Sequence, residues 1–462
     1  MLPTEQRPLR VAIIGSGPSG FYVAEALLKS GSHITVDMFE RLPAPYGLVR
    51  YGVAPDHPKI KNVIKVYEKI IERPGFHFFG HVTVGQDISV EELKKFYDAI
   101  IFACGAETDR HLNIPGEGLK GCHTATEFVA WYNGRPEYRH HQFDLSHETA
   151  IVIGQGNVAV DVCRILSKTA DELKNTDICQ HALDVLSQSH IKEVHMIGRR
   201  GPAQAAFTPI EVRELEEFLN CDVVLDPKDL ELNSASQREL EDPHNAPKKK
   251  NLEILKHLVA SAATQQQKGK AKKLFLHFLK SPHEIKGNGR VEKIILEKNE
   301  LTGEPGQQKA KGTGLIEELK CGLVFCSIGY RGVPIPGVPF DHEKGIIPNI
   351  KGRVVSSNGT TKTCPGLYCT GWIKRGPVGI IGTNKADAEE TVQHLLEDLN
   401  QLPACEQPST EGLLGLLRRK NIRAITFEDW KKIDAAEIAR GQKVGKPREK
   451  FVSIEEMLSV LK

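Results

Sequence analysis

The segment from Arg10 to Glu40 constrains the fold most, because it predicts a strand, a glycine-rich turn, a helix and a second strand in close succession. Residues 11–14 form a short apolar run that is typical of a buried parallel strand. The turn Gly15-Ser16-Gly17-Pro18-Ser19-Gly20 follows at once and matches G-x-G-x-x-G. A helix and a second strand complete the unit, which predicts an α/β fold with a dinucleotide-binding site.

Each glycine of this turn has a physical reason. Gly15 permits the tight bend, Gly17 lets the backbone approach a pyrophosphate, and Gly20 lets the helix pack on the strand. The helix N-terminus then attracts the anion. Glu40, at the end of the second strand, is an acceptor for ribose hydroxyl groups. The alternative, a glycine-rich turn that binds no nucleotide, does not explain why all these features occur together.

A second fingerprint occurs near the middle of the chain. Residues 150–153 predict a strand, and Gly154-Gln155-Gly156-Asn157-Val158-Ala159 matches G-x-G-x-x-A. The next strand ends in Gly198-Arg199-Arg200, at the position that Glu40 has in the first unit. An acidic residue there pairs with a free 2′-hydroxyl, whereas two arginines suit a 2′-phosphate. The first site is therefore expected to take FAD and the second NADP(H); the alternative is that the two arginines form a solvated turn.

The composition excludes several classes of protein. The net charge of +2 argues against a dedicated nucleic-acid binder. No apolar run reaches the roughly 18 residues needed to span a bilayer. The ten cysteines include no C-x-x-C pair, so we expect reduced thiols, no metal site and no redox-active disulfide. We expect a cytoplasmic protein, or one of the mitochondrial matrix if a leader was removed from a eukaryotic precursor.

Three further stretches bear on these sites. The Pro/Gly-rich residues 41–58 follow Glu40 directly and must pass over any ligand there. Residues 372–383 form a third glycine-rich loop that opens a helix at 385–399, and such a helix start offers amide donors near a flavin. Residues 304–314 are rich in Gly, Lys and Gln and predict a mobile loop.

Five motifs together resemble the adrenodoxin reductase family, which includes related bacterial ferredoxin–NADP reductases. They are GSGPSGFYVAEAL, PYGLVRYGVAPDHPKIKNV, IGQGNVAVDVCRIL, IGRRGPAQAAFTPIEVRE and GWIKRGPVGIIGT. The resemblance extends from about Arg10 to the C-terminus and implies two Rossmann-like, three-layer α/β domains, as in glutathione reductase. An NADP-binding domain, residues 107–331, would be inserted into a FAD-binding domain formed by residues 1–106 and by residues 332–462 with a C-terminal helical tail.

The resemblance also implies the residues that hold each cofactor. FAD would be bound by Gly15, Gly17, Pro18, Ser19, Gly20, Glu40, Arg41, Leu48, Val84, Trp372, Gly379, Ile380 and Ile381. NADP would be bound by Gln155, Gly156, Asn157, Val158, Arg199, Arg200, Glu211 and Gly379.

The implied reaction passes a hydride from NADPH to FAD and then single electrons to a ferredoxin- or adrenodoxin-type [2Fe-2S] protein, or to another small iron–sulfur protein. Positioning supplies most of the catalysis. His57 and Asp161 are candidates for proton handling, since both could face the domain interface; a packed loop histidine and a helix-start carboxylate are the alternatives. We expect a monomer.

Iron–sulfur partners of this kind are acidic, so a basic docking face is expected on Arg213, Lys248, Lys249 and Lys250, although a lysine run is often simply solvated. Two other functions remain open. One is an NADPH-oxidising flavoprotein like the glutamate synthase small subunit, which normally carries an N-terminal region of clustered cysteines. The other is a non-catalytic NADP-binding sensor. A disulfide reductase is disfavoured, because C-x-x-C is missing.

Overall fold

The structure is a computed structural model that describes residues 7–264, 269–356 and 362–462. It divides into two compact units. The first contains residues up to 108, the segment 133–137 and residues 329–462, and the second contains residues 109–132 and 138–328. The sequence-based boundaries after residues 106 and 331 lie close to these limits, but nothing in the sequence indicated that 133–137 returns to the first unit.

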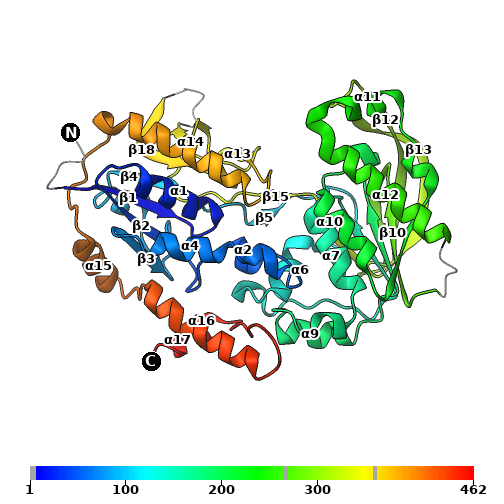
Figure 1. The fold of residues 1–462 in the computed structure, drawn as a ribbon, viewed down its shortest axis with the longest axis horizontal. Helices are drawn as coiled ribbons and strands as arrows, with labels where there is room; N and C mark the ends of the chain where they lie inside the picture. The colour runs from blue at the N-terminus through cyan, green and yellow to red at the C-terminus, as the bar shows by residue number, and fades with distance from the viewer. Residues whose placement is uncertain (1–6, 265–268, 357–361) are drawn as a thin grey trace. The chain divides into compact units, whose positions relative to one another are not determined.

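The first unit is built on a seven-stranded sheet in the order β16-β17-β18-β4-β1-β2-β3 (Figure 1). The strands from β18 to β3 are parallel, and β17 and β16 add an antiparallel edge. The strands are β1 (Leu9–Ile14), β2 (Ile34–Glu40), β3 (Phe76–Gly80), β4 (Ala99–Phe102), β16 (Asn349–Ile350), β17 (Arg353–Val355) and β18 (Thr363–Cys369).

Both faces of this sheet are covered, as expected for parallel strands that are apolar throughout. Val11 and Ile13 of β1 pack in one cluster with α1 and α14, and Ala12 and Ile14 pack in another with α5 and α15. The helices are α1 (Pro18–Lys29), α2 (Leu48–Tyr51), α3 (Pro58–Lys61), α4 (Ile64–Ile71), α5 (Val90–Leu93), α13 (Trp372–Arg375), α14 (Thr383–Glu397), α15 (Thr410–Arg419), α16 (Phe427–Gln442) and α17 (Ile454–Ser459).

The second unit has a fully parallel six-stranded sheet in the order β6-β14-β7-β8-β10-β9. Its strands are β6 (Cys122–Thr124), β7 (Thr149–Ile153), β8 (Glu193–Ile197), β9 (Cys221–Leu225), β10 (Lys272–His277) and β14 (Leu323–Cys326). Its helices are α6 (Ala125–Tyr132), α7 (Asn157–Ser167), α8 (Ala170–Leu173), α9 (Gln180–Ser187), α10 (Pro209–Arg213), α11 (Ser234–Glu241) and α12 (Ala246–Thr264). Among the helices of the described residues, none is long and apolar enough to cross a membrane.

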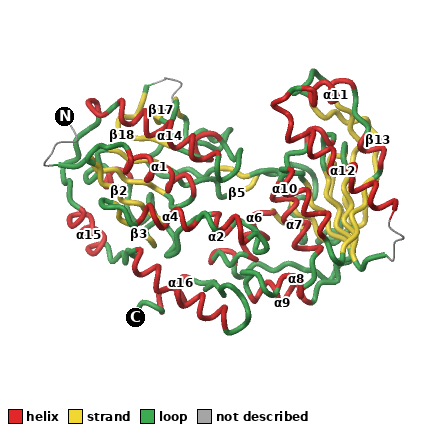
Figure 2. The backbone as a smooth tube through the Cα atoms, viewed as in Figure 1, coloured by secondary structure: helices red, strands yellow, loops and turns green. Residues whose placement is uncertain are grey.

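Two smaller sheets complete the fold. β11 (Lys280–Lys286), β12 (Lys293–Thr302) and β13 (Lys309–Lys320) form an antiparallel sheet in the second unit (Figure 2). β5 (Thr108–Asp109) pairs with β15 (Tyr330–Arg331), at the two points where the chain passes between the units.

One local expectation, the loop at residues 304–314, was wrong. Much of the stretch 304–314 is the start of strand β13, because its pairing with β12, from Thr302↔Lys309 onward, overrides a composition that is typical of a loop. After β8 the chain forms the short helix α10, which is followed by a 3₁₀ turn at Glu214–Glu217.

Candidate functional site

The glycine-rich turn of the first unit leaves the N-terminus of α1 open. Gly15 has a φ of +108°, and a Cβ atom there would lie 2.6 Å from the Ala103 carbonyl oxygen, so only glycine fits. Gly17 caps the helix in an extended conformation without any side-chain hydrogen bond, and no atom lies within 4 Å of where its Cβ would be. The first amides of α1 therefore point to a space that a phosphate group can enter, which fits the pyrophosphate of a dinucleotide.

Glu40 ends β2 beside this turn, as the sequence predicts. One carboxylate oxygen accepts hydrogen bonds from the Ser16 amide (3.2 Å) and hydroxyl (2.6 Å), and the other accepts from the Leu42 amide (3.1 Å). A carboxylate offers about four lone-pair positions, so capacity remains for a ribose. The neighbouring Arg41 forms ion pairs with Glu107 (3.0 Å) and Glu137 (2.6 Å).

The Pro/Gly-rich loop lies directly on the glycine turn. The Tyr46 amide donates to the Ser16 carbonyl at 3.0 Å. A Cβ atom on Gly47 would lie 3.0 Å from the Gly17 Cα. Leu48 then begins the single turn α2. These backbone contacts with Ser16 and Gly17 place the loop against the glycine turn, next to the space expected to hold the ligand.

The third glycine-rich loop joins the first fingerprint through Asn384, which sequence reasoning missed. The Asn384 side-chain oxygen accepts from the Ser19 hydroxyl at 3.0 Å and from Arg375 at 2.9 Å. Within the described residues, the indole N–H of Trp372 is buried and has no hydrogen-bond acceptor. Ile380 is 59% exposed. An orphaned donor and an exposed apolar side chain in one loop fit a bound flavin ring.

The other residues predicted to contact FAD lie near these loops or elsewhere in the same unit. Gly379 has a φ of +90°, and Ile381 packs at the edge of the apolar cluster that includes α1 and α14. Val84 forms an isolated bridge with Ile88 on the opposite face of the sheet, in the cluster that contains Ile14.

The second glycine turn repeats the first, at the end of β7. Gly156 caps α7 without a side-chain hydrogen bond, and no atom lies within 4 Å of where its Cβ would be. The Gln155 side-chain amide donates to the His277 carbonyl at 2.9 Å. It lies against Gly198, where a Cβ atom would be only 1.9 Å from the Gln155 side-chain oxygen. Asn157, at the start of α7, accepts from the Thr208 amide at 2.8 Å, and the partly buried Val158 packs against the apolar core of the second unit. This helix start also fits a phosphate group.

Arg199 and Arg200 follow β8 and are both exposed. Within the described residues, neither guanidinium forms an ion pair shorter than 4.0 Å with a carboxylate. The pKa of Arg200 is lowered, first by partial burial and then by repulsion from Arg199, while Glu239 opposes the shift. Two adjacent cations without a close counter-ion fit a doubly charged phosphate ligand.

Asp161 and Glu211 share a buried cation. Arg164, which is fully buried in α7, pairs with Asp161 at 2.6 Å, with Glu214 at 2.9 Å and with Glu211 at 3.7 Å. Asp161 is therefore one member of a charge network within the second unit. His57 lies in the first unit, where it precedes α3 and is buried.

The predicted docking residues differ in their surroundings. Lys248 pairs with the buried Glu239 at 2.6 Å, and Lys250 pairs with Glu253 at 3.0 Å. Arg213 and Lys249 are exposed, and neither forms an ion pair with a described residue. Lys248 therefore has a role inside the fold, whereas Arg213 and Lys249 are available to a partner.

The cysteines are all free thiols. Burial raises the pKa of Cys104, next to the first glycine turn, and of Cys321 to about 12. Because the thiolate is the reactive form, these thiols are poorly suited to disulfide exchange.

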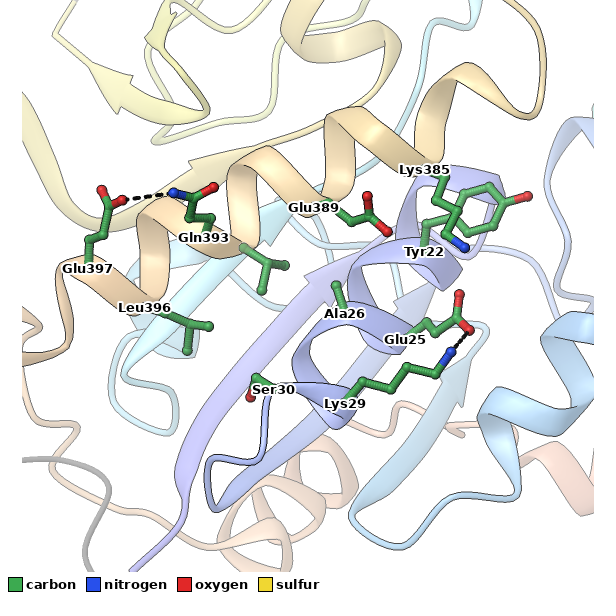
Figure 3. A pocket seen from close by; sticks show the side chains of 11 residues that line it. Tyr22, Glu25, Ala26, Lys29, Ser30, Lys385, Glu389, Gln393, Leu396 and Glu397 are labelled. Atoms are coloured by element: carbon green, nitrogen blue, oxygen red, sulfur yellow. Dashed lines mark hydrogen bonds and ion pairs between the residues drawn. The ribbon is translucent and has the colours of Figure 1, made fainter.

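A groove of about 630 Å³ lies between α1 and α14 (Figure 3). The groove is lined by the apolar side chains of Ala26, Val392 and Leu396 and by charged side chains such as Lys29 and Lys385. None of the residues predicted to bind a cofactor lines it.

Comparisons with known proteins agree with this geometry. Residues 9–201 match the family model described as "Pyridine nucleotide-disulphide oxidoreductase". The chain is 43% identical to the mitochondrial NADPH:adrenodoxin oxidoreductase of Arabidopsis thaliana, covering 98% of this chain and 95% of that one. It is 45% identical to the NADPH-ferredoxin reductase FprA of Mycobacterium tuberculosis, over 98% and 99% of the two chains. The solved structure of FprA in complex with NADPH superposes with a TM-score of 0.90 at 45% identity, over 98% and 99% of the chains.

Proposed function

Since the chain belongs to the adrenodoxin reductase family of NADPH-dependent ferredoxin reductases, we infer that it oxidises NADPH and passes the electrons through FAD to a small iron–sulfur protein. The observation that carries this function is the pair of open glycine turns with opposite charges beside them. Glu40 accompanies the first turn, and Arg199 with Arg200 accompanies the second. This contrast matches one nucleotide without a 2′-phosphate and one with it.

The first unit would hold FAD with its own main chain. The amides at the start of α1 bind the pyrophosphate, and Glu40 accepts from the ribose. The indole N–H of Trp372 is available to the ring system. When bound, FAD accepts a hydride from NADPH and releases electrons one at a time. The residues of this unit orient the ring and exclude water from it.

The second unit would hold NADPH by the start of α7 and by Arg199 and Arg200. For proton handling we propose an imidazole nitrogen of His57 and the carboxylate of Asp161. The ion pair with Arg164 at 2.6 Å holds the Asp161 carboxylate in a fixed orientation. The acceptor we propose is a [2Fe-2S] protein, and we propose a monomer located in the cytoplasm, or in the mitochondrial matrix of a eukaryote.

The test of this function is spectroscopic. The purified protein should be yellow, and its flavin absorbance should bleach under anaerobic conditions much faster with NADPH than with NADH. Ferredoxins from the source organism, coupled to cytochrome c, should then be reduced at the expense of NADPH. A colourless protein that binds NADP would instead be a sensor, and equal bleaching by both coenzymes would contradict the assignment of the second site.

A further inference from the structure

The loop that carries Arg199 and Arg200 is anchored through its backbone, not through its charged side chains. All three carbonyl groups of the loop Gly198-Arg199-Arg200 accept a hydrogen bond. Lys280 donates its amide to Gly198 at 2.9 Å, and Leu279 donates its amide to Arg200 at 3.1 Å. The carbonyl of Arg199, between them, accepts from the side chain of Asn299 at 2.9 Å.

Asn299 connects these anchors. Its side-chain amide also donates to the Ser281 hydroxyl at 2.7 Å, and its backbone amide donates to the Leu279 carbonyl at 2.7 Å. Leu279 has a φ of +54°, a conformation that a branched side chain rarely adopts and that needs support from its surroundings. Asn299 is 4% exposed, so it makes these bonds in place of bonds to water.

The chain forms a β-bulge to place this residue. The pairing of β12 with β13 shifts register between Glu297 and Asn299. Bulges of this kind re-aim a side chain, here an amide toward the nucleotide-binding edge of the neighbouring parallel sheet. The small antiparallel sheet β11-β12-β13 thereby contacts the loop that follows β8.

We propose that Asn299 is a positioning residue for coenzyme specificity, because it holds the loop in the conformation that presents Arg199 and Arg200 to the 2′-phosphate. The two like charges repel each other, so an unanchored loop would relax by moving them apart. The inference rests on the proposed role of the two arginines. It predicts an effect on NADPH and none on NADH, which has no 2′-phosphate.

The first experiment compares Asn299→Ala with the wild-type holoenzyme. The KM for NADPH should rise about three- to tenfold, as expected when the buried hydrogen bond that anchors the Arg199 carbonyl is lost. The kcat with NADPH and the constants for NADH should stay unchanged. Calorimetric titration with 2′,5′-ADP should show the same weakening, whereas 5′-AMP should bind equally to both proteins. Asn288→Ala, in the exposed turn between β11 and β12, is the matched control and should change nothing.

A second variant keeps the inference testable if Asn299→Ala does not fold. Ser281→Ala removes one acceptor of the Asn299 side-chain amide but leaves its hydrogen bond to the Arg199 carbonyl. It should therefore also lower the affinity for 2′,5′-ADP, but less than Asn299→Ala does. A Ser281→Ala protein with unchanged affinity for 2′,5′-ADP, in the absence of a folded Asn299→Ala protein, would overturn the proposal.

A double-mutant cycle separates this inference from the function on which it rests. In an Arg199→Ala/Arg200→Ala background, adding Asn299→Ala should have no further effect on 2′,5′-ADP. If the arginine variant loses 2′,5′-ADP affinity but Asn299→Ala does not, the positioning role is wrong and the site assignment stands. If the arginine variant shows no selective loss, the site assignment itself is wrong. Equal losses for NADPH and NADH in Asn299→Ala would indicate a merely structural role.

Discussion

At the scale of single residues, Arg199 and Arg200 separate the two nucleotide sites. Replacing both with Ala should weaken the binding of NADPH by about 1.5–3 kcal/mol for each charge-assisted contact that is lost. NADH should be barely affected, because it offers no 2′-phosphate. Steady-state kcat/KM values for the two coenzymes measure this difference, and equal losses would contradict the assignment.

His77 gives a pH dependence at the same scale. Its Nδ1 lies 2.7 Å from the buried carboxylate of Asp37, which raises the pKa of His77 despite opposing desolvation. A raised folded-state pKa adds stability that is complete below the unfolded value of about 6.5 and is lost as the pH rises through the folded value. The side chain is 46% exposed, so solvent screens the pair and the effect is below about 1 kcal/mol.

The measurement compares the wild-type protein with His77→Gln, which keeps a donor but cannot be charged. The difference between their melting temperatures should favour the wild type at pH 5.5 and shrink by pH 8.5. A difference that grows with pH would show that the pair does not act through the imidazolium charge.

Single residues also show what a sequence can reveal about a site. The glycines, Glu40 and the two arginines were predictable, because their spacing follows from the geometry of a strand, a turn and a helix. Asn384 and Asn299 were not, because each acts on a residue far away in the chain, Ser19 and Arg199 respectively. An isolated asparagine carries no periodic signal, so only the tertiary structure reveals its partner.

At the scale of elements, the same distinction holds. The end of β8 (Glu193–Ile197) was predicted just before Gly198-Arg199-Arg200, because the apolar residues Met196 and Ile197 are followed directly by a glycine that marks a turn. β13 was missed because Lys309–Lys320 is largely exposed and polar, and only pairing with β12 makes it a strand. The short α2 was also missed, since a single turn within a Pro/Gly-rich loop depends on its neighbours.

Helix α16, in the C-terminal part of the chain, supports α2 through a buried ion pair. Arg50 of α2 and Glu437 of α16 form a two-pronged ion pair at 2.9 and 2.5 Å, and both side chains are fully buried. Glu437 also accepts from the Phe451 amide at 2.9 Å. The C-terminal tail thereby holds the loop that lies on the first glycine turn.

Removing one charge of this pair should be costly. Glu437→Gln leaves the Arg50 guanidinium buried without its counter-ion, which costs about 3–5 kcal/mol in comparable cases. The melting temperature should fall, and flavin fluorescence should report release of FAD at a correspondingly lower temperature. Glu428→Gln, at an exposed ion pair on the same helix, is the control and should change neither. A Glu437→Gln protein as stable as the control would show that the brace is not needed.

At the scale of the whole molecule, the net charge of +2 does not show where the positive charges are exposed. Ion pairs within the fold use many of the cations, so sequence runs alone do not locate a docking face. Lys248 is the clearest case. Its contact and that of Gln204 lower the pKa of the buried Glu239, even though burial itself opposes the shift. Neutralising Lys248 would therefore disturb the fold as well as any docking.

The sharper docking experiment changes only Arg213 and Lys249, which are exposed and pair with no described residue. Reversing both to Glu should raise the KM for an acidic ferredoxin at low salt. The rise should correspond to a loss of about 0.2–1 kcal/mol of binding free energy for each exposed contact. The dependence of this KM on ionic strength should become flatter, because fewer charges are screened. Turnover of NADPH with ferricyanide should stay unchanged. Lys174→Glu, an exposed lysine of the same unit that pairs with Asp171, is the control. Unchanged ferredoxin kinetics at low salt in the double variant would place the docking face elsewhere on the molecule.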